Sequence, residues 1–266
     1  MSEHRPLAQF LTLTPHHDSG YSAQTAPNWS QGRTLYGGAS AALCLSAVLA
    51  GLDTPPAPLR SAQFAFVGPS SGSLQLTPTL LRQGKASAIY GVDLFTAEGL
   101  AARATLAFGQ SRESALDYSA LPAPEVLDPE DCPPFFEGPG APSFTQNFEF
   151  RKAGGHSLVT GAPEADVLVW VRHRDAAAVD SAVALLALAD ALPPAVMAMF
   201  RNLAPVSSLT WTVDMLGETL PGPEEWFLLS SQAEASQHGY SPQNMRIWNR
   251  QRRPVAVGRQ QVTTFY

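Results

Sequence analysis

The chain has few cysteines, few basic residues and no long apolar run, and each shortage excludes a class of protein. Of its 266 residues only Cys44 and Cys132 are cysteine, and neither lies in a CxxC or Cys/His pattern, so we expect neither a disulfide framework nor a zinc site. The net charge is −6 and the basic residues are dispersed, which excludes the basic surface that nucleic-acid binding requires. No apolar run approaches the roughly 20 residues that span a bilayer, and residues 1–10 contain no apolar leader. These absences predict a cytoplasmic chain without a membrane span.

The patterns of the commonest hydrolase classes are missing as well. The histidines are scattered without metal-ligand spacing, and no Gly-x-Ser-x-Gly elbow is present. The run His16-His17-Asp18 is expected in a surface loop or an edge strand near the N-terminus. We therefore predict no metal and no serine triad.

What the chain does contain is enough apolar material for a real core, divided by a proline-rich stretch. Hydrophobic residues make up 45% of the sequence, which suits one large or two modest domains. Proline cannot donate to a sheet ladder and restricts the residue before it, so the proline-rich, acidic stretch is the best candidate for a linker. We predict an N-terminal unit over 1–115, a linker over 116–145 and a C-terminal unit over 146–266. The prolines of this stretch are Pro122, Pro124, Pro129, Pro133, Pro134, Pro139 and Pro142.

Each unit contains one apolar helix followed by strands. Residues 35–52 are nearly all small or apolar and open with Tyr36-Gly37-Gly38, and a second helix is predicted from a cap at Asp175 to Asp190, before Pro193-Pro194. Both helices are apolar around most of their circumference, so we expect each to be buried and wrapped by its own antiparallel sheet, an α+β unit present twice. The strands predicted from period-two alternation are 74–81, 88–95, 100–109, 167–171, 208–216, 226–234, 244–249 and 255–265.

The two halves also repeat one plan with different polar residues. Residues 61–66 lead to Gln110, and residues 208–212 lead to Gln260, nearly fifty positions later in each case. A repeat of this length is a duplicated domain. We take Gln63 and Gln110 as first-half counterparts with structural roles, because the first helix carries no acid.

A resemblance to a known family follows from motifs in both halves. The chain resembles the TesB-type acyl-CoA thioesterases, and the resemblance implies a double hotdog fold, hydrolysis of an acyl-CoA and no cofactor besides the coenzyme A of the substrate. It places the family's catalytic Asp, Thr or Ser, and Gln on Asp190, Thr210 and Gln260. The motifs that carry it are Pro27-Asn-Trp29, Gly32-Arg-Thr-Leu-Tyr-Gly-Gly38, Arg60-Ser-Ala-Gln-Phe-Ala-Phe-Val-Gly-Pro69, Leu81-Arg-Gln-Gly-Lys85, Ala189-Asp190, Leu209-Thr210, Glu225-Trp226-Phe227 and Val255-Ala256 through Gln260.

The chemistry of these residues agrees with such an assignment. Asp190 is the only ionisable residue between 181 and 199, and a carboxylate in so apolar a stretch needs hydrogen-bond partners. Thr210 and Gln260 are candidates for those partners, and the three side chains together could hold one water molecule for attack on a thioester. Gly37 and Gly38 open the first helix, where free backbone N–H groups could bind the oxyanion.

Simpler interpretations exist for each residue. Asp190 could end its helix and face solvent, and Thr210 could be an ordinary strand residue. Gln261 follows Gln260, so a register shift of one residue would exchange their faces. Gly37 and Gly38 could serve close packing alone.

Other functions and partners remain open at this stage. The same fold could bind acyl-CoA without turnover. A hydratase ranks only third, because hotdog hydratases use an Asp with a nearby His and no histidine can be placed beside Asp190. Phosphates of coenzyme A would be met by Arg82, Arg151 or Arg246, and Phe64, Phe66, Leu43, Met197 and Met199 could line the acyl pocket. We expect a homodimer or a higher homo-oligomer.

Overall fold

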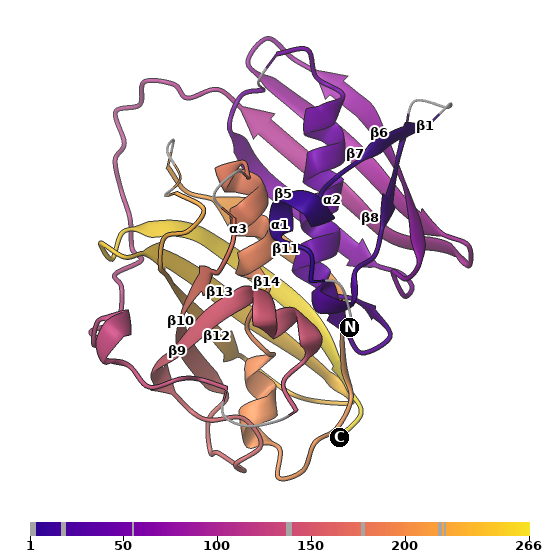
Figure 1. Ribbon diagram of the computed structural model, residues 1–266. Coiled ribbons are helices and arrows are strands. Elements are labelled where there is room, and N and C mark those ends of the chain that lie inside the picture. The colour runs from indigo at the N-terminus through magenta and orange to yellow at the C-terminus, as the bar shows by residue number, and fades with distance from the viewer. Residues whose placement is uncertain are drawn as a thin grey trace.

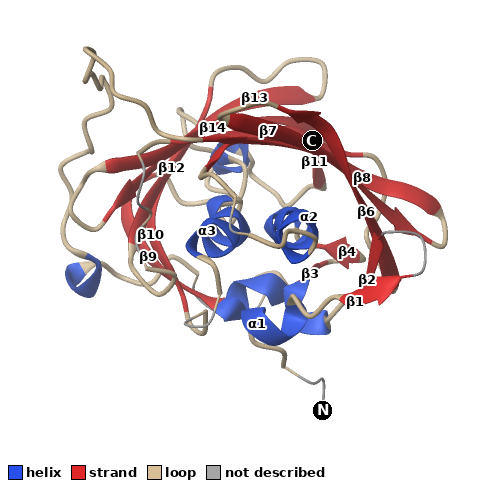
Figure 2. Cartoon of the chain, turned by 90° about the horizontal axis from the view of Figure 1, so that it is seen from above, coloured by secondary structure: helices blue, strands red, loops and turns tan. Residues whose placement is uncertain are grey.

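A single curved sheet wraps around two buried helices. The computed structural model describes residues 4–16, 20–54, 56–136, 140–176, 179–217, 220 and 222–266, so His17 and Asp18 lie outside the described residues. The sheet has twelve strands in the order β1-β2-β6-β7-β8-β5-β11-β14-β13-β12-β10-β9, and every pairing is antiparallel. Figure 2 shows this sheet curving around α2 (Gly37–Ala50) and α3 (Ser181–Ala189), with α1 (Leu7–Phe10) on the open side.

The sheet has more strands than the alternation pattern predicted. All eight predicted strands are present, and β1, β2, β5 and β9 join them. Two short strands, β3 (Ser30–Gln31) and β4 (Thr34–Leu35), form a separate ribbon before α2. The strands of the large sheet are β1 (Thr14–His16), β2 (Gly20–Gln24), β5 (Leu59–Phe66), β6 (Ser73–Gln83), β7 (Ser87–Thr96), β8 (Gly99–Gly109), β9 (Phe148–Gly155), β10 (Asp166–His173), β11 (Val206–Met215), β12 (Phe227–Ala233), β13 (Tyr240–Asn249) and β14 (Pro254–Thr264).

The two halves share one sheet because the first strand after each buried helix pairs with its counterpart in the other half. β5 of the first half and β11 of the second half form an antiparallel ladder from Ala65 opposite Thr210 to Ser61 opposite Asp214. The two helices lie side by side on the concave face (Figures 1 and 2). The expected double α+β architecture is confirmed, with the two sheets fused into one rather than separate around each helix.

Both helices are buried because their sequences are small and apolar on every side. Alanine and leucine fill α2 and α3, and nearly all their residues are buried. The cap of α3 is Asp180, whose carboxylate accepts hydrogen bonds from the backbone N–H groups of Ala182 and Val183. The predicted cap Asp175 is therefore wrong by five positions. At the other end the helix stops at Ala189, and Asp190 is its C-cap.

The proline-rich stretch is not a free tether. Residues 121–136, which we call the strap, lie against the outer face of the C-terminal half, where the long pink segment runs in Figure 1. The indole N–H of Trp170 donates to Leu127 O at 3.0 Å, and that of Trp248 donates to Leu121 O at 2.9 Å. Ala123, Val126 and Cys132 of the strap pack with Trp170, Trp226, Leu228 and Trp248 in a second apolar cluster outside the main core.

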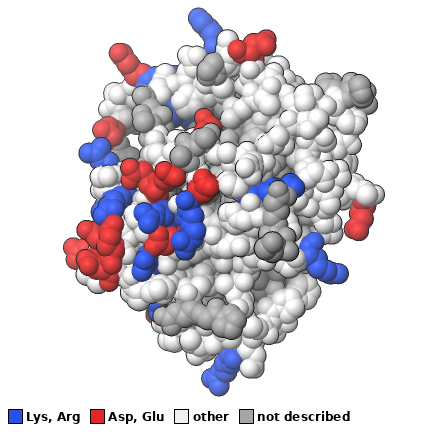
Figure 3. Space-filling model, in the orientation of Figure 1, with Lys and Arg blue, Asp and Glu red and all other residues white. Residues whose placement is uncertain are grey.

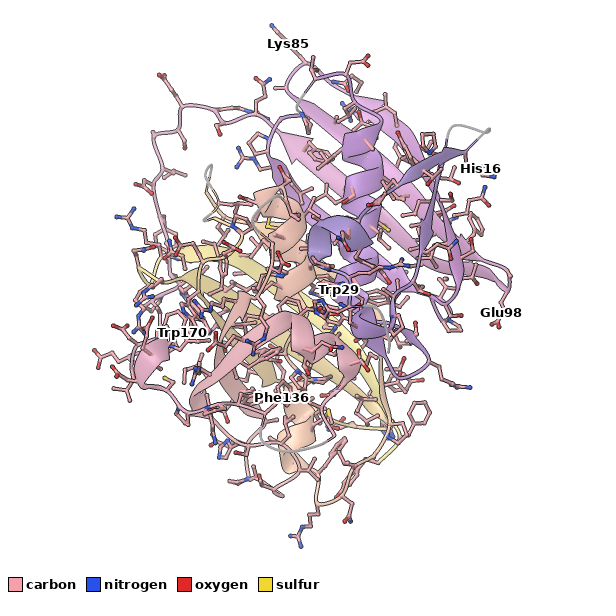
Figure 4. All side chains as sticks on the ribbon, in the orientation of Figure 1. His16, Trp29, Lys85, Glu98, Phe136 and Trp170 are labelled. Atoms are coloured by element: carbon pink, nitrogen blue, oxygen red, sulfur yellow. The ribbon has the colours of Figure 1, made fainter. Side chains whose placement is uncertain are left out.

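Charged residues fasten this strap. Arg250 forms a bidentate pair with Glu130, and Arg252 donates to the carbonyl oxygens of Pro124 and Val126. Figure 3 shows the resulting concentration of charge on this side of the C-terminal half, while much of the visible face is uncharged. In Figure 4 Trp170 lies at this outer side, whereas Trp29 lies near the centre of the molecule. None of the helices in the described ranges is long and apolar enough to cross a membrane.

Candidate active site

Asp190 and Gln260 come together although 70 positions separate them in the sequence. Asp190 caps the C-terminal end of α3, and Gln260 lies on β14 with its side chain on the concave face of the sheet, 4% exposed. The side-chain amide of Gln260 donates to Oδ1 of Asp190 at 2.8 Å. Its neighbour Gln261 is on the opposite face, so the register places the predicted glutamine at the carboxylate.

The first turn of α2 meets the same carboxylate. A Cβ atom added to Gly37 would lie 2.5 Å from Oδ2 of Asp190, which leaves room only for glycine. The backbone N–H of Gly38 hydrogen-bonds the carboxylate, and the N-terminal end of a helix favours negative charge. The N–H of Gly37 has no hydrogen-bond partner among the described residues. Of the two predicted oxyanion donors, Gly38 is therefore engaged by Asp190 and Gly37 is free.

Burial gives this carboxyl group an unusual proton affinity. Asp190 is half-buried as a residue, but its carboxyl group points inward at Gly37 and Gln260. Burial raises the pKa of Asp190 from 3.8 to about 7, although the hydrogen bonds from Gln260 and Gly38 favour the ionised form and work in the opposite direction. Such a group can take up and release a proton near neutral pH, as a general base must.

Tyr36 fixes the two helix ends against each other. Its hydroxyl donates to Ala187 O of α3 at 2.7 Å, and its ring stacks on Phe144 with centroids 4.1 Å apart. Burial, together with the negative charge of Asp190, raises the pKa of Tyr36 well above its usual value, so the hydroxyl stays neutral. Sequence reasoning noted Tyr36 as part of the helix opening but gave it no role in the site.

Thr210 does not join Asp190 and Gln260. It is exposed and pairs with Gln261 and Ala65, on the face of the sheet opposite Gln260. The residue of β11 that lies opposite Gln260 is the buried Trp211. The predicted trio is therefore corrected: the structure unites two of its members and places the third on the other face.

A β-bulge explains the difference. The register of β11 against β14 shifts between Ser208 and Thr210, so one extra residue is inserted there. Ser208 pairs with Val262, whose side chain is buried, and is itself half-buried. The hydroxyl that shares the concave face with Gln260 is thus that of Ser208, which sequence reasoning missed.

Within the described ranges, only the second half of the duplicated fold carries this polar pair. On the first-half strands, Phe64 of β5 pairs with Ala104 of β8, as Trp211 pairs with Gln260 in the second half. The helix α2 ends at Gly51 where α3 ends at Asp190. Gln63 and Gln110 are both exposed, so the predicted equivalence of Gln110 with Gln260 is wrong and Ala104 takes that place.

The residues predicted to line the acyl pocket or to bind the phosphates of coenzyme A do not all lie beside Asp190. Phe66 lies 3.2 Å from the Cβ position of Gly37 and so borders the site, whereas Met199 is 42% exposed. Arg151 is held by Glu149 in an ion pair.

Two surface cavities of about 370 and 270 Å³ lie elsewhere, over Trp226 and over Phe148, and neither is lined by Asp190 or Gln260. Among the described residues no group of His, Cys, Asp and Glu could hold a metal ion.

Comparisons with known proteins agree with this architecture. The family model described as the acyl-CoA thioesterase N-terminal domain matches residues 25–109, and the one described as the C-terminal domain matches residues 129–264. The second match begins within the stretch that we predicted as a linker. No curated protein matches the sequence.

Solved structures resemble the chain along almost its full length. A protein with a hot dog fold from Alicyclobacillus acidocaldarius has a TM-score of 0.86 at 21% identity, covering 98% of both chains. The tesB protein of Mycobacterium avium subs paratuberculosis has a TM-score of 0.80 at 16% identity and covers 97% of this chain and 98% of its own. The acyl-CoA thioesterase II TesB2 of Mycobacterium marinum has a TM-score of 0.78 at 17% identity, covering 98% of both. With both of its halves matched by the family models, the chain belongs to the TesB-type acyl-CoA thioesterase family and has the double hotdog fold.

Proposed function

We propose that the chain hydrolyses an acyl-CoA to the free acid and coenzyme A, with Asp190 as the general base. The observation that carries the proposal is a carboxyl group with a pKa of about 7, held between the amide of Gln260 and the N–H of Gly38 at the start of a helix. A carboxylate with this proton affinity suits the activation of water near neutral pH. Coenzyme A is part of the substrate, and the reaction needs no further cofactor.

The steps follow from the positions of these groups. Ionised Asp190 takes a proton from a water molecule while the oxygen of that water bonds to the thioester carbon. The carbonyl oxygen of the thioester thereby becomes an oxyanion. The free N–H of Gly37 donates to that oxyanion, at a helix end whose partial positive charge favours it. The intermediate then collapses, the bond from carbon to sulfur breaks, and the leaving sulfur takes the proton that Asp190 held, so that coenzyme A departs as the thiol. This transfer leaves Asp190 ionised again, and the free acid departs.

Ser208 supplies the hydroxyl that was expected from Thr210. It pairs with Val262, two residues from Gln260 on the same concave face, and we assign it the role of holding the attacking water together with the amide. Replacing Ser208 by Ala should therefore lower kcat, whereas Thr210→Val on the opposite face should leave kcat unchanged. An equal loss in both variants would argue against this placement.

The experiment that tests the function is the release of free thiol from short, medium, long and aromatic acyl-CoAs. Asp190→Asn should lose activity by several orders of magnitude, while Asp214→Asn, an exposed acid on β11, serves as the matched control. Calorimetry with a non-hydrolysable thioether analogue of an acyl-CoA measures whether the wild type and Asp190→Asn bind the ligand. Turnover that persists in Asp190→Asn would refute the mechanism, and binding without any turnover in the wild type would identify an acyl-CoA-binding protein instead.

A further inference from the structure

Two buried side-chain atoms without hydrogen-bond partners lie on either side of Gln260. They are Nε1 of Trp211 and Oε1 of Gln243, and among the described residues only Nδ1 of His173 shares this condition. Trp211 and Gln243 are both fully buried, at 0% exposure. Buried polar atoms are nearly always paired, and each exception calls for a ligand or a water to explain it.

The sheet register places these residues in one row. Trp211 of β11 and Gln243 of β13 each pair with Gln260 of β14, so all three lie at the same level on adjacent strands. Because directly paired residues of an antiparallel ladder point to the same face, the three side chains share the concave face that Asp190 covers. An unpaired donor and an unpaired acceptor thus flank the amide that holds the proposed base.

Trp211 is held in place by its neighbours with its N–H unpaired. Its ring stacks on Phe64 with centroids 5.3 Å apart, and Phe64 stacks in turn on Phe66, which borders Gly37. On the other side lies Gly258, where an added Cβ would be 3.5 Å from Nε1. The aromatic row therefore runs from the first turn of α2 to the indole, whose N–H is buried beside Gly258 without a hydrogen-bond partner.

Gln243 is oriented by hydrogen bonds at its other end. Its Nε2 donates to Oγ of Ser241 at 2.7 Å, and that hydroxyl donates to Ala235 O at 2.6 Å. With the amide nitrogen held in this way, Oε1 is the atom left without a partner, and it can only accept a hydrogen bond.

We propose that Trp211 and Gln243 complete the reaction site around Gln260, with the indole N–H of Trp211 donating to the thioester carbonyl oxygen and Oε1 of Gln243 accepting from the attacking water. This inference rests on the proposed hydrolysis. Trp211 joins the N–H of Gly37 as a second donor to the oxyanion, and Gln243 orients the water whose proton goes to Asp190. No atom is transferred to either side chain.

Kinetics of Trp211→Phe and Gln243→Met test the two roles. Each substitution keeps most of the volume and removes the polar atom. Trp211→Phe should lower kcat by about 100-fold or more, the usual loss for one oxyanion donor, with little change in KM; Gln243→Met should lower kcat by a smaller factor. The controls are Trp248→Phe, whose indole serves the strap, and Gln261→Met, on the opposite face; both should keep the wild-type kcat. Variants with wild-type kcat at Trp211 and Gln243 would overturn the proposal.

A binding measurement tests the carbonyl contact without turnover. The indole N–H signal of Trp211, assigned in ¹⁵N-labelled protein by its loss in Trp211→Phe, should shift with a ketone analogue of an acyl-CoA and stay in place with an alkyl-CoA thioether that has no carbonyl. Equal shifts with both ligands, or no shift with the saturating ketone, would refute the role of Trp211 even if the protein is an active thioesterase. Failure of both ligands to bind would refute the proposed function together with this inference.

Discussion

Replacing Asp190 by Asn should stabilise the protein at pH 8 while it abolishes hydrolysis. The pKa of this carboxyl group is about 7 in the folded chain and 3.8 as its ordinary value. The folded state therefore binds the proton more tightly than the unfolded state, so stability is highest at low pH and falls as the pH rises from about 4 to 7. At roughly 1.4 kcal/mol per unit, ionised Asp190 costs on the order of 4 kcal/mol above pH 7.

The net gain is smaller because Asn fits the site less well. A carboxylate accepts from both Gly38 N–H and Gln260, whereas an amide has one acceptor oxygen, and an unsatisfied partner costs about 1–3 kcal/mol. We expect the variant to be more stable by about 1–3 kcal/mol at pH 8 and to lose that advantage at pH 4. His173 has the opposite effect, since burial lowers its pKa to about 4 and stability is lost as the pH falls from 6.5. The contribution of His173 to stability is the same in the wild type and in Asp190→Asn, so it cancels when their free energies of unfolding are subtracted.

Urea unfolding at unit steps from pH 4 to pH 8 measures this difference. The free energy of unfolding of Asp190→Asn minus that of the wild type should increase by up to about 1.4 kcal/mol per pH unit between pH 4 and 7, and then level off. Asp214→Asn, the exposed control, should give a difference that does not change with pH. A constant difference for Asp190→Asn would show that the carboxyl group is not held at a raised pKa and would remove the main support for its role as a base.

Three further predictions follow from the same contacts. The kcat/KM of the wild type should rise about tenfold per pH unit below pH 7 and level off above it, because Asp190 must be ionised to act; a flat profile between pH 5 and 8 contradicts this. Gly37→Ala should lower kcat about 100-fold, because its Cβ would lie 2.5 Å from Oδ2 of Asp190, while Gly91→Ala, which meets only the Leu81 side chain at 3.4 Å, should remain active in the same thiol assay. Trp170→Phe removes the hydrogen bond to the strap and should lower the free energy of unfolding by about 1 kcal/mol without changing kcat; a loss of activity would connect the strap to the site.

The parts of the site that could be predicted from sequence are those set by local pattern. Asp190 stands alone as an ionisable residue after an apolar helix, and the glycines at positions 37 and 38 mark a close approach at the start of another. The partnership of Asp190 with Gln260 came from the family resemblance, and the hydrogen bond between them agrees with it. Asp190 and the two glycines, by contrast, are each visible within a few residues of the sequence.

Thr210 shows where local pattern and resemblance disagreed. The apolar alternation of Trp211, Val213 and Met215 already puts Thr210 on the polar face of β11, and that is where it lies. Only the bulge beside Leu209 brings Ser208 to the same face as Gln260, and a bulge depends on the partner strand rather than on the residues that form it. The unpaired atoms of Trp211 and Gln243 are equally invisible in sequence, because they depend on three strands being aligned.

The strap could not be located from sequence for a similar reason. Its prolines correctly excluded a central strand or a long helix, but composition does not say which surface an extended segment covers. The indoles of Trp170 and Trp248 decide this, since each donates to a strap carbonyl more than 40 positions away in the sequence. Contacts over such distances are set by the tertiary fold.

The site combines the first turn of a helix from one half with a carboxyl group and an amide from the other half, so neither half carries the chemistry by itself. The only covalent connection between the halves runs through residues 111–120, all of which are exposed. A chain cut within this segment would keep the β5–β11 ladder, the contact between α2 and α3, and the strap in place. Two separately produced fragments would then show the proposed activity only when they meet, and thiol release would report their association.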